Sequence, residues 1–315
     1  MTAVTTAAAA RTRPPGSGPV RAPARPRWRT WEWAGLLYLA PAMAVYTAFT
    51  VRPIVETVWM SFFEWDGLTL ATWVGTANYV DVLTDPLVRT ALGHSLAFVV
   101  FYALLPTAVG LVLAGIMSRI RIRGMTAWRT MLFLPQVLSS VVVAVAWRWI
   151  YDDTGPLNGV LRAIGLDALT TAWLGDYATA LPAVGFIGTW VQFGLCLMLF
   201  LAGAQRIPPE LYEAARIDGA GAVREFFTVT VPGLRNEVRI ALVLTIIFAL
   251  RNFDIVWNTT SGGPGTSTTV PSVYVYQGAF VTREVGAAAA VAVLLTAFIL
   301  AVAGLVLRVL RERKG

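Results

Sequence analysis

Charged side chains are scarce in this chain of 315 residues. They make up 14% of it, against roughly 25% in soluble domains, while hydrophobic residues make up 57%. Too little polar surface remains to cover a water-soluble globule, so we expect a bilayer to be the solvent for most of the chain. The net charge of +7 comes from arginines grouped between apolar runs, a pattern typical of membrane topology and not of a nucleic-acid-binding face.

Cysteine, histidine and lysine each occur once, as Cys196, His94 and Lys314. A single cysteine allows no intrachain disulfide or cysteine-based metal site, so Cys196 is expected to be a buried, inert thiol. His94 cannot form a paired metal site and is expected to be a satisfied or exposed side chain.

Motifs for catalysis are also missing. The stretch "SGGPGTST" has the glycines of a phosphate loop, but a P-loop needs Gly-Lys-Ser/Thr before a helix, and Lys314 is next to the C-terminus. No Gly-x-Ser-x-Gly or His-Glu-x-x-His motif occurs. We therefore predict no catalytic residues, no metal site, no cofactor of its own and no ATP hydrolysis by this chain alone.

Long apolar runs are abundant. A membrane-spanning helix takes about 20 mostly apolar residues. Five uncharged runs qualify, at 34–51, 95–118, 130–147, 177–205 and 285–307. A sixth candidate at 240–258 is weaker, since Arg251 and Asp254 interrupt it. The arginine clusters on either side of it share one face of the membrane only if it crosses too. The sequence therefore predicts an all-α integral membrane protein with six transmembrane helices and both termini in the cytosol.

A short amphipathic stretch, "ELYEAARIDGAG", occupies 210–221 between two apolar runs. Pro208 and Pro209 suit the first positions of a helix, where a missing N–H is harmless. Gly219 is predicted to cap that helix in the left-handed conformation.

Leu211, Ala214 and Ala215 fall on one small apolar face of this helix. A second short amphipathic helix should follow it and stop at Pro232. Two short helices joined at a glycine bend would let another protein approach the backbone closely. The alternative left open by the residues alone is a helix that lies on the lipid surface.

The same residues carry a resemblance. "EAARIDGAGAVREFFTVTVP" resembles the EAA loop of permease subunits of binding-protein-dependent ABC importers, which reads Glu-Ala-Ala, three residues, Gly, nine residues, Ile, one residue, Leu-Pro. The matching positions are Glu213, Ala214, Ala215, Gly219 and Pro232, with Val229 and Val231 in place of Ile and Leu. Other stretches, such as "FDIVWNTTSGGPG", resemble the carbohydrate branch and the first of its two paired permeases, from about residue 34 onward.

The resemblance implies the transmembrane fold of type I ABC importers. The first transmembrane helix and an outer loop would occupy 31–90, and the ABC transmembrane domain 91–308, with the EAA loop at 205–236. Residues 1–30, which are basic and rich in Ala and Pro, are expected to be a disordered cytosolic tail. Residues 309–315 would be a second cytosolic tail.

The resemblance also implies partners. A separate ATPase that binds ATP and Mg would dock on the EAA loop. The coupling residues would be Glu213, Ala214, Ala215, Asp218, Gly219 and Pro232. The expected partners are a second permease subunit, two ATPase subunits, an extracytoplasmic solute-binding protein and the lipid bilayer, but no nucleic acid.

Polar side chains inside membrane spans are candidates for function. The resemblance implies that the helices on either side of the EAA loop line the transport path. Its candidate residues are Gln192, Thr245, Phe248 and Asn252. Amides, hydroxyls and aromatic rings suit a sugar, while the alternative is hydrogen bonding between helices. Arg251 and Asp254 are expected to form a structural ion pair, the alternative being gating or binding of an anionic sugar.

The sequence thus predicts a permease subunit, not an enzyme, in an ATP-driven sugar or oligosaccharide importer of a bacterial cell membrane. An importer of glycerol phosphate or another polyol is the near alternative. An ion-driven secondary transporter and a membrane-embedded scaffold are alternatives of other classes. Ion coupling is disfavoured because the five clear runs contain no Asp or Glu.

Overall fold

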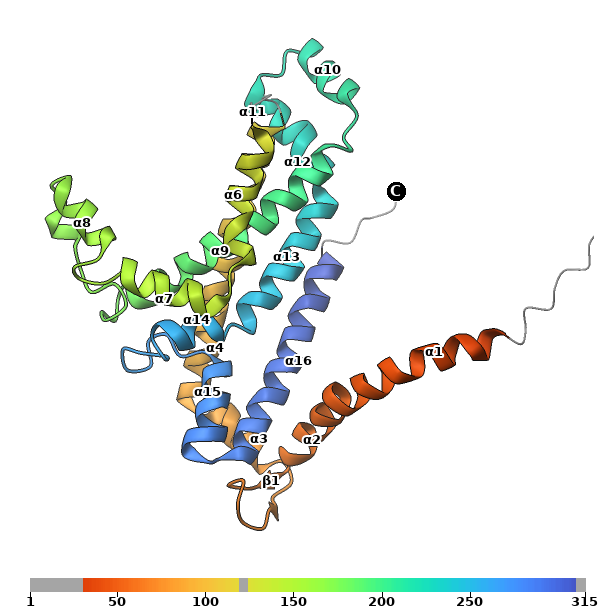
Figure 1. Cartoon of the computed structure of the whole chain (residues 1–315), viewed down its shortest axis with the longest axis vertical. Helices are drawn as coiled ribbons and strands as arrows, with labels where there is room; N and C mark the ends of the chain where they lie inside the picture. The colour runs from red at the N-terminus through yellow and green to blue at the C-terminus, as the bar shows by residue number, and fades with distance from the viewer. Residues whose placement is uncertain (1–30, 119–123, 310–315) are drawn as a thin grey trace, which may run out of the picture. The chain divides into compact units, whose positions relative to one another are not determined.

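The computed structural model describes residues 31–118 and 124–309, and the regular structure there is almost entirely helical, as predicted (Figure 1). The expected tail at 1–30, the last residues of the expected tail at 309–315, and the cations Arg119, Arg121 and Arg123 lie outside these residues. The chain divides into two units, Met1–Pro53 and Ile54–Gly315.

The first unit is helical throughout its described part. It contains α1 (Trp31–Tyr46), the π-helical turn η2 (Thr47–Val51) and the start of α2 (Arg52–Met60). The predicted run 34–51 is thus helical over its whole length, with Pro41 inside α1. A proline is tolerated in a membrane helix because local π turns and neighbouring groups can satisfy the freed backbone carbonyl.

Three helices of the described residues are long and apolar enough to cross a bilayer: Pro86–Met117, α9 (Ala180–Ala204) and α16 (Val285–Val309). They match the predicted runs 95–118, 177–205 and 285–307. The first comprises α4 (Pro86–Val99), the π turn η3 (Val100–Leu104) and α5 (Leu105–Met117). Asp85 caps it, since its carboxylate accepts the Leu87 N–H at 2.7 Å.

The predicted run 130–147 does not form one straight helix. Its two halves, α6 (Met125–Val137) and α7 (Ser140–Ile150), meet at 97° around Leu138 and Ser139. Serine favours helix ends over interiors, because its hydroxyl competes for nearby backbone groups, and two serines stand at this break. The pair could serve as one broken span.

The candidate span at 240–258 is not one continuous helix. α13 (Arg235–Leu250) ends at Arg251, and α14 (Asp254–Thr259) begins after Phe253. Asp254 suits the first turn of a new helix, where a negative charge favours the helix dipole. The 16 residues of α13 span roughly 24 Å, short of the roughly 30 Å of a bilayer core. Six spans therefore remain a prediction.

The remaining elements are short. They are the strands β1 (Phe63–Glu64) and β2 (Thr72–Trp73), the helices α3 (Ala77–Thr84), α8 (Pro156–Ala163), α10 (Pro209–Ile217), α11 (Ala222–Glu225), α12 (Val231–Gly233) and α15 (Pro271–Gln277), the 3₁₀ turn η4 (Asp167–Leu169), and the π turns η5 (Phe226–Thr230) and η6 (Gly278–Thr282). The antiparallel β1–β2 hairpin pairs Phe63 with Trp73 and is the one departure from all-α structure in the described chain.

The hairpin loop is held by Asp66. Its carboxylate accepts the backbone N–H groups of Thr69 and Leu68 and the Thr69 hydroxyl, at 2.7, 2.9 and 2.8 Å. These bonds favour the charged form and lower the pKa of Asp66 to about 2. The Asn78 amide ties the hairpin to α3 by donating to the carbonyls of Ser61 and Phe63, both at 2.9 Å.

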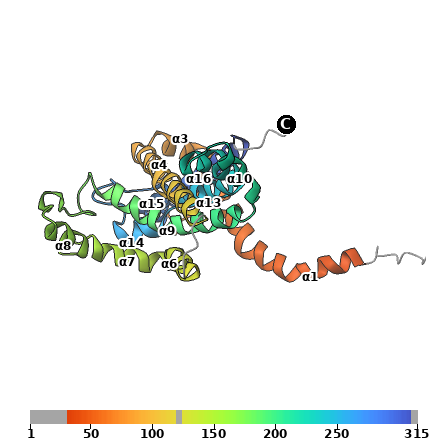
Figure 2. The same ribbon diagram turned by 90° about the horizontal axis from the view of Figure 1, so that it is seen from above.

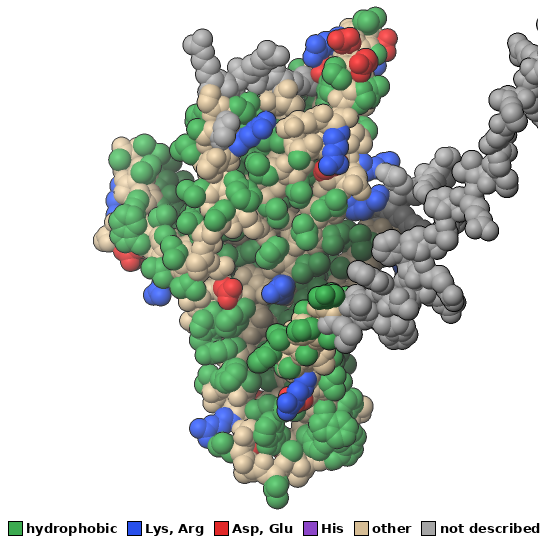
Figure 3. Space-filling model, turned by 45° about the vertical axis from the view of Figure 1, so that its right-hand side comes forward, with side chains coloured by type: hydrophobic (Ala, Val, Ile, Leu, Met, Phe, Trp, Pro, Cys, Tyr) green, Lys and Arg blue, Asp and Glu red, His purple; other side chains and the backbone are tan. Residues whose placement is uncertain are grey.

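Within the second unit, α13 packs against α4, α9 and α16, and Figures 1 and 2 both show α13 and α16 side by side. Helix α10 and the β1 hairpin lie at opposite ends. Charged side chains gather at the α10 end, while apolar ones cover much of the visible face (Figure 3). This distribution suits a bilayer around the long helices.

Cys196 and His94 have the surroundings that the sequence predicts. Cys196 is a free, fully buried thiol in α9. The Nδ1 of His94 lies 2.8 Å from the Thr269 carbonyl, to which it donates. The glycine-rich stretch at 261–268 is a loop closed by its own hydrogen bonds, including Thr268 N–H to the Gly262 carbonyl at 3.1 Å and the Thr260 and Thr268 hydroxyls at 2.7 Å.

Candidate functional site

Helix α10 contains the Glu-Ala-Ala sequence. Pro209 occupies its first turn, and Gly219 follows its end with φ +77°, both as predicted. The second short helix runs from α11 through η5 into α12 and continues past Pro232 to Gly233, so the predicted stop at Pro232 is wrong. The π turn η5 shifts the backbone hydrogen bonds by one residue just before Pro232, which lets the helix absorb the missing N–H.

One face of α10 is bonded to its own chain. The Tyr212 hydroxyl lies 3.3 Å from the Thr230 hydroxyl, and Arg216 Nε lies 3.4 Å from Glu225 Oε2. The Glu225 side chain is only 4% exposed, whereas that of Arg216 is 62% exposed. A cavity of about 380 Å³ opens beside these groups and is also bordered by Glu213.

The opposite face of α10 is open and carries apolar side chains beside the exposed acids Glu210 and Asp218. Ile217 is 86% exposed and Leu211 52%, and Ala214 is exposed between them, while Ala215 is half-buried. An isoleucine so exposed is notable because it lies at the charged end of the unit, where a bilayer core would not cover it. This face fits a protein surface.

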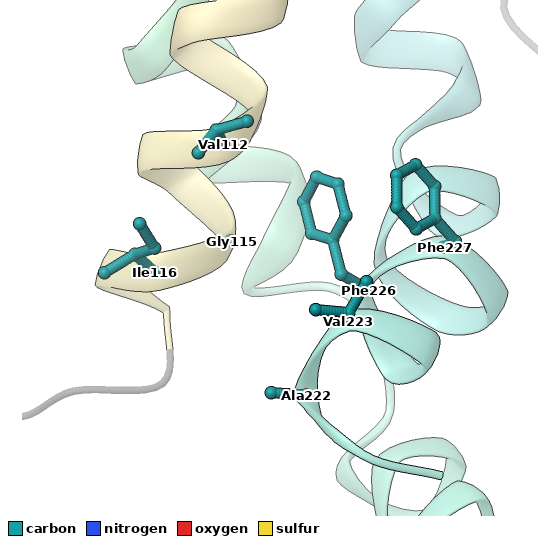
Figure 4. Close-up of a pocket in the computed structure, with 7 residues that line it drawn as sticks. All are labelled: Val112, Gly115, Ile116, Ala222, Val223, Phe226 and Phe227. Carbon is teal, nitrogen blue, oxygen red and sulfur yellow. The ribbon is translucent and has the colours of Figure 1, made fainter.

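An apolar groove of about 440 Å³ lies between α5 and the segment that follows α10 (Figure 4). It is lined by Val112, Gly115, Ile116, Ala222, Val223, Phe226 and Phe227. The Phe226 ring packs directly on Gly115, where an added Cβ would lie 2.6 Å from a ring carbon. Only glycine allows this approach, which joins η5 to the end of α5.

A second, polar pocket of about 250 Å³ forms where the two helix breaks meet. The α6–α7 break contributes to it from one side and the α13–α14 break from another, with α9 and η3 between them. Its lining consists of Tyr102, Gln136, Leu138, Ser140, Val191, Gln192, Phe248, Arg251, Asn252, Phe253, Asp254 and Ile255.

Two amide oxygens of this pocket are buried without a partner in the described structure: Gln136 Oε1 and Gln192 Oε1. Gln192 is only 2% exposed. Asn252 is held in place, since its Nδ2 donates to the Tyr102 hydroxyl at 2.9 Å and its backbone carbonyl accepts from Ser272 Oγ at 2.5 Å. The pocket therefore combines a fixed amide–phenol pair with free hydrogen-bond acceptors.

Three of the four predicted path residues line this pocket: Gln192, Phe248 and Asn252. Thr245 does not line it. It is fully buried, and its hydroxyl donates to the Ala241 carbonyl of its own helix at 2.7 Å.

Gln136 and Tyr102 were missed by the sequence analysis. Gln136 could have been found, because it is the one amide in the run 130–147 and follows Pro135 directly. The sequence does not mark Tyr102 as a pocket residue, because it is simply an aromatic residue in an apolar run and its role depends on where Asn252 lies in the fold.

The predicted ion pair between Arg251 and Asp254 is not formed among the described residues, although both side chains line the polar pocket and both are exposed. Their spacing would place them on one face only in a continuous helix. The chain is not helical between them, so that spacing does not bring the charges together.

Residues 106–314 match the family model described as "Binding-protein-dependent transport system inner membrane component". The chain belongs to this family. The permease is 39% identical to the probable ABC transporter permease protein YurN of Bacillus subtilis, over 81% of its length and 88% of YurN. It is 35% identical to the diacetylchitobiose uptake system permease protein NgcF of Streptomyces coelicolor, over 89% of its length and 83% of NgcF.

The permease is also 32% identical to the lactose transport system permease protein LacF of Rhizobium radiobacter, over 79% of its length and 84% of LacF. Its fold resembles a crystal structure of a bacterial ABC transporter involved in importing the acidic polysaccharide alginate. The TM-score is 0.78 at 22% identity, covering 91% of the permease and 99% of that chain. The predicted family and its helical permease fold are thus confirmed.

Proposed function

We propose that this permease carries a sugar or oligosaccharide across a bacterial cell membrane as one subunit of an ATP-driven importer. The observation that carries the proposal is the polar pocket, in which Gln136 Oε1 and Gln192 Oε1 are buried without partners. Leaving a buried acceptor unpaired costs about 1–3 kcal/mol. A ligand with several hydroxyl donors would satisfy both oxygens, and carbohydrates are such ligands.

The surroundings of these oxygens fit the same ligand. Phe248 is 45% exposed, and both Phe248 and Phe253 line the pocket. Aromatic rings can cover the apolar faces of a sugar while amides bind its hydroxyls. Transporters often place substrate between broken helices, whose free backbone groups face the site. The names of NgcF and LacF point to diacetylchitobiose and lactose for those relatives.

The α10 end would bind the ATPase of the importer. In this proposal the outward face of α10 docks on a separate ATPase, which binds ATP and Mg, and the coupling residues are Glu213, Ala214, Ala215, Asp218, Gly219 and Pro232. The exposed Ile217 adds an apolar anchor of the kind that protein interfaces bury. A second permease, two ATPase subunits and an extracytoplasmic binding protein complete the importer. The permease would cross the membrane six times, with both termini in the cytosol.

The test is transport by the complete importer in proteoliposomes. The sugar is first identified as the compound that raises the melting temperature of the partner binding protein. We expect saturable uptake of that sugar that requires ATP and is blocked by vanadate. Uptake driven by an ion gradient without the ATPase would contradict the ATP-driven mechanism. A preference for glycerol phosphate would contradict the sugar assignment in favour of a polyol.

A further inference from the structure

We propose that the Arg216–Glu225 ion pair is the joint that makes α10 and the α11–η5 helix move as one body. In this role the pair transmits the movement of a docked ATPase into the permease. The inference rests on the proposed function, and it assigns a positioning role to two residues outside the six proposed coupling residues.

The connection between α10 and α11 is too weak to fix their angle. It passes through Gly219 and Gly221, and an added Cβ at either glycine would meet nothing within 4 Å. The backbone bonds near it close the end of α10 and the start of α11 separately, as with Ala220 N–H to the Ala215 carbonyl and Glu225 N–H to the Gly221 carbonyl, both at 2.9 Å. Two glycines with open surroundings form a flexible linker. Side chains must therefore hold the two helices together.

Arg216 and Glu225 supply such a link across the linker. Arg216 lies one helical turn from Tyr212 on the inner face of α10, so the ion pair at 3.4 Å and the contact of Tyr212 with Thr230 at 3.3 Å act side by side. Because Glu225 is 4% exposed, removing the cation beside it costs more than breaking an ion pair at the surface. The strength of the link comes from the buried carboxylate.

Beyond the joint, packing continues to the polar pocket. Phe226, the neighbour of Glu225, packs on Gly115 of α5, as Figure 4 shows for the two segments. The hydroxyl of Thr107, in α5, lies 3.9 Å from the thiol of Cys196, in α9. Cys196 is one helical turn from Gln192. A displacement of α10 would therefore reach the helix that carries Gln192, provided that the joint holds.

The experiment uses the complete importer and measures ATP hydrolysed per sugar transported, together with the ATPase that co-purifies. We expect Arg216→Ala and Glu225→Gln to keep the ATPase bound while the ATP-to-sugar ratio rises at least fivefold. Glu225→Gln preserves side-chain size, so it keeps the test valid where Arg216→Ala fails to fold. Glu237→Gln is the matched control. It breaks an ion pair with Arg206 at 3.7 Å that does not touch α10, and it should leave the ratio unchanged.

A rescue separates positioning from simple stability. In an Arg216→Cys/Glu225→Cys variant, a short thiol-specific cross-linker should restore the wild-type ratio, and cleaving the link should abolish it again. The one native thiol, Cys196, is fully buried and should not react. An unchanged ratio in the single variants, or parallel loss of ATPase binding and uptake that cross-linking does not restore, would overturn the joint. Wild-type importer without ATP-driven sugar uptake would instead overturn the proposed function.

Discussion

The α10 end and the polar pocket differ in which side chains are exposed and which polar groups have partners. At α10, Arg216 is paired with Glu225, while the apolar Ile217 is 86% exposed. In the pocket, the amide of Gln192 is 2% exposed, and its oxygen has no partner in the described structure. One region offers apolar surface, and the other offers hydrogen-bond acceptors.

This contrast indicates what each region lacks. Burying a side chain of the size of Ile217 contributes about 1.5–3 kcal/mol, which docking of a protein can supply. An unpaired buried amide oxygen costs about 1–3 kcal/mol, which a small hydroxylated ligand can recover. We therefore expect a protein to cover the α10 end and a polar solute to occupy the pocket. Each of the following predictions changes one region and leaves the other intact.

The largest effect is expected from Gly219→Val. Gly219 has φ +77°, where a β-branched residue is strained by about 1–3 kcal/mol, so α10 would end in a different geometry. Uptake and co-purified ATPase should both fall between about fivefold and a hundredfold, in line with that strain. The measurement is sugar uptake alongside quantitative pull-down of the ATPase.

Gly221→Val is the matched control for this change. Gly221 has φ −71° and ψ 174°, an extended backbone that valine adopts readily, and its surroundings are equally open. We expect it to keep most of the uptake. Full uptake and full ATPase binding in Gly219→Val would contradict the docking of α10 and favour a helix that merely lies on lipid.

A smaller effect on uptake, and none on assembly, is expected from Gln192→Leu. Leucine has a similar volume and removes an oxygen that has no partner, so the melting temperature of the purified permease should stay equal or rise. Uptake should fall about tenfold, as expected for one lost hydrogen bond of about 1.4 kcal/mol. Both are measured on the same preparation.

Thr245→Val serves as the control on the neighbouring helix. The Thr245 hydroxyl bonds to its own helix and does not reach the pocket, so uptake should change little. If Gln192→Leu instead lowers the melting temperature and leaves uptake intact, Gln192 holds helices together and does not contact the substrate.

The sequence was most informative where short-range rules decide the structure. The start of α10 at Pro209 and the left-handed Gly219 follow from backbone preferences within a few residues, and both were predicted. Long apolar runs such as 285–307 likewise form helices whatever their neighbours are. The local structure of the α10 segment was therefore predictable from its sequence.

The pocket depends on long-range geometry, which the sequence does not show. The break at Ser139 falls inside a run that hydropathy treats as continuous, and the break at Arg251 falls where a charge already interrupts the run. Where the two breaks meet, the pocket lining includes Gln136 and Tyr102, which come from distant parts of the chain. Thr245 shares a helical face with Phe248 in the sequence pattern, yet its hydroxyl turns back to its own helix. Periodicity alone could not separate these two.

The smallest effect should come from Arg251 and Asp254, which test where the pocket's charges act. Because the break keeps them from forming an ion pair in the described structure, and both are exposed, Arg251→Gln and Asp254→Asn should act independently. In a double-mutant cycle on uptake, their interaction energy should stay within about 0.5 kcal/mol. A paired Arg251 and Asp254 would give about 0.5–3 kcal/mol. A value near the top of that range would mean that the charges meet in another state of the transport cycle, and that the α13–α14 break closes during transport.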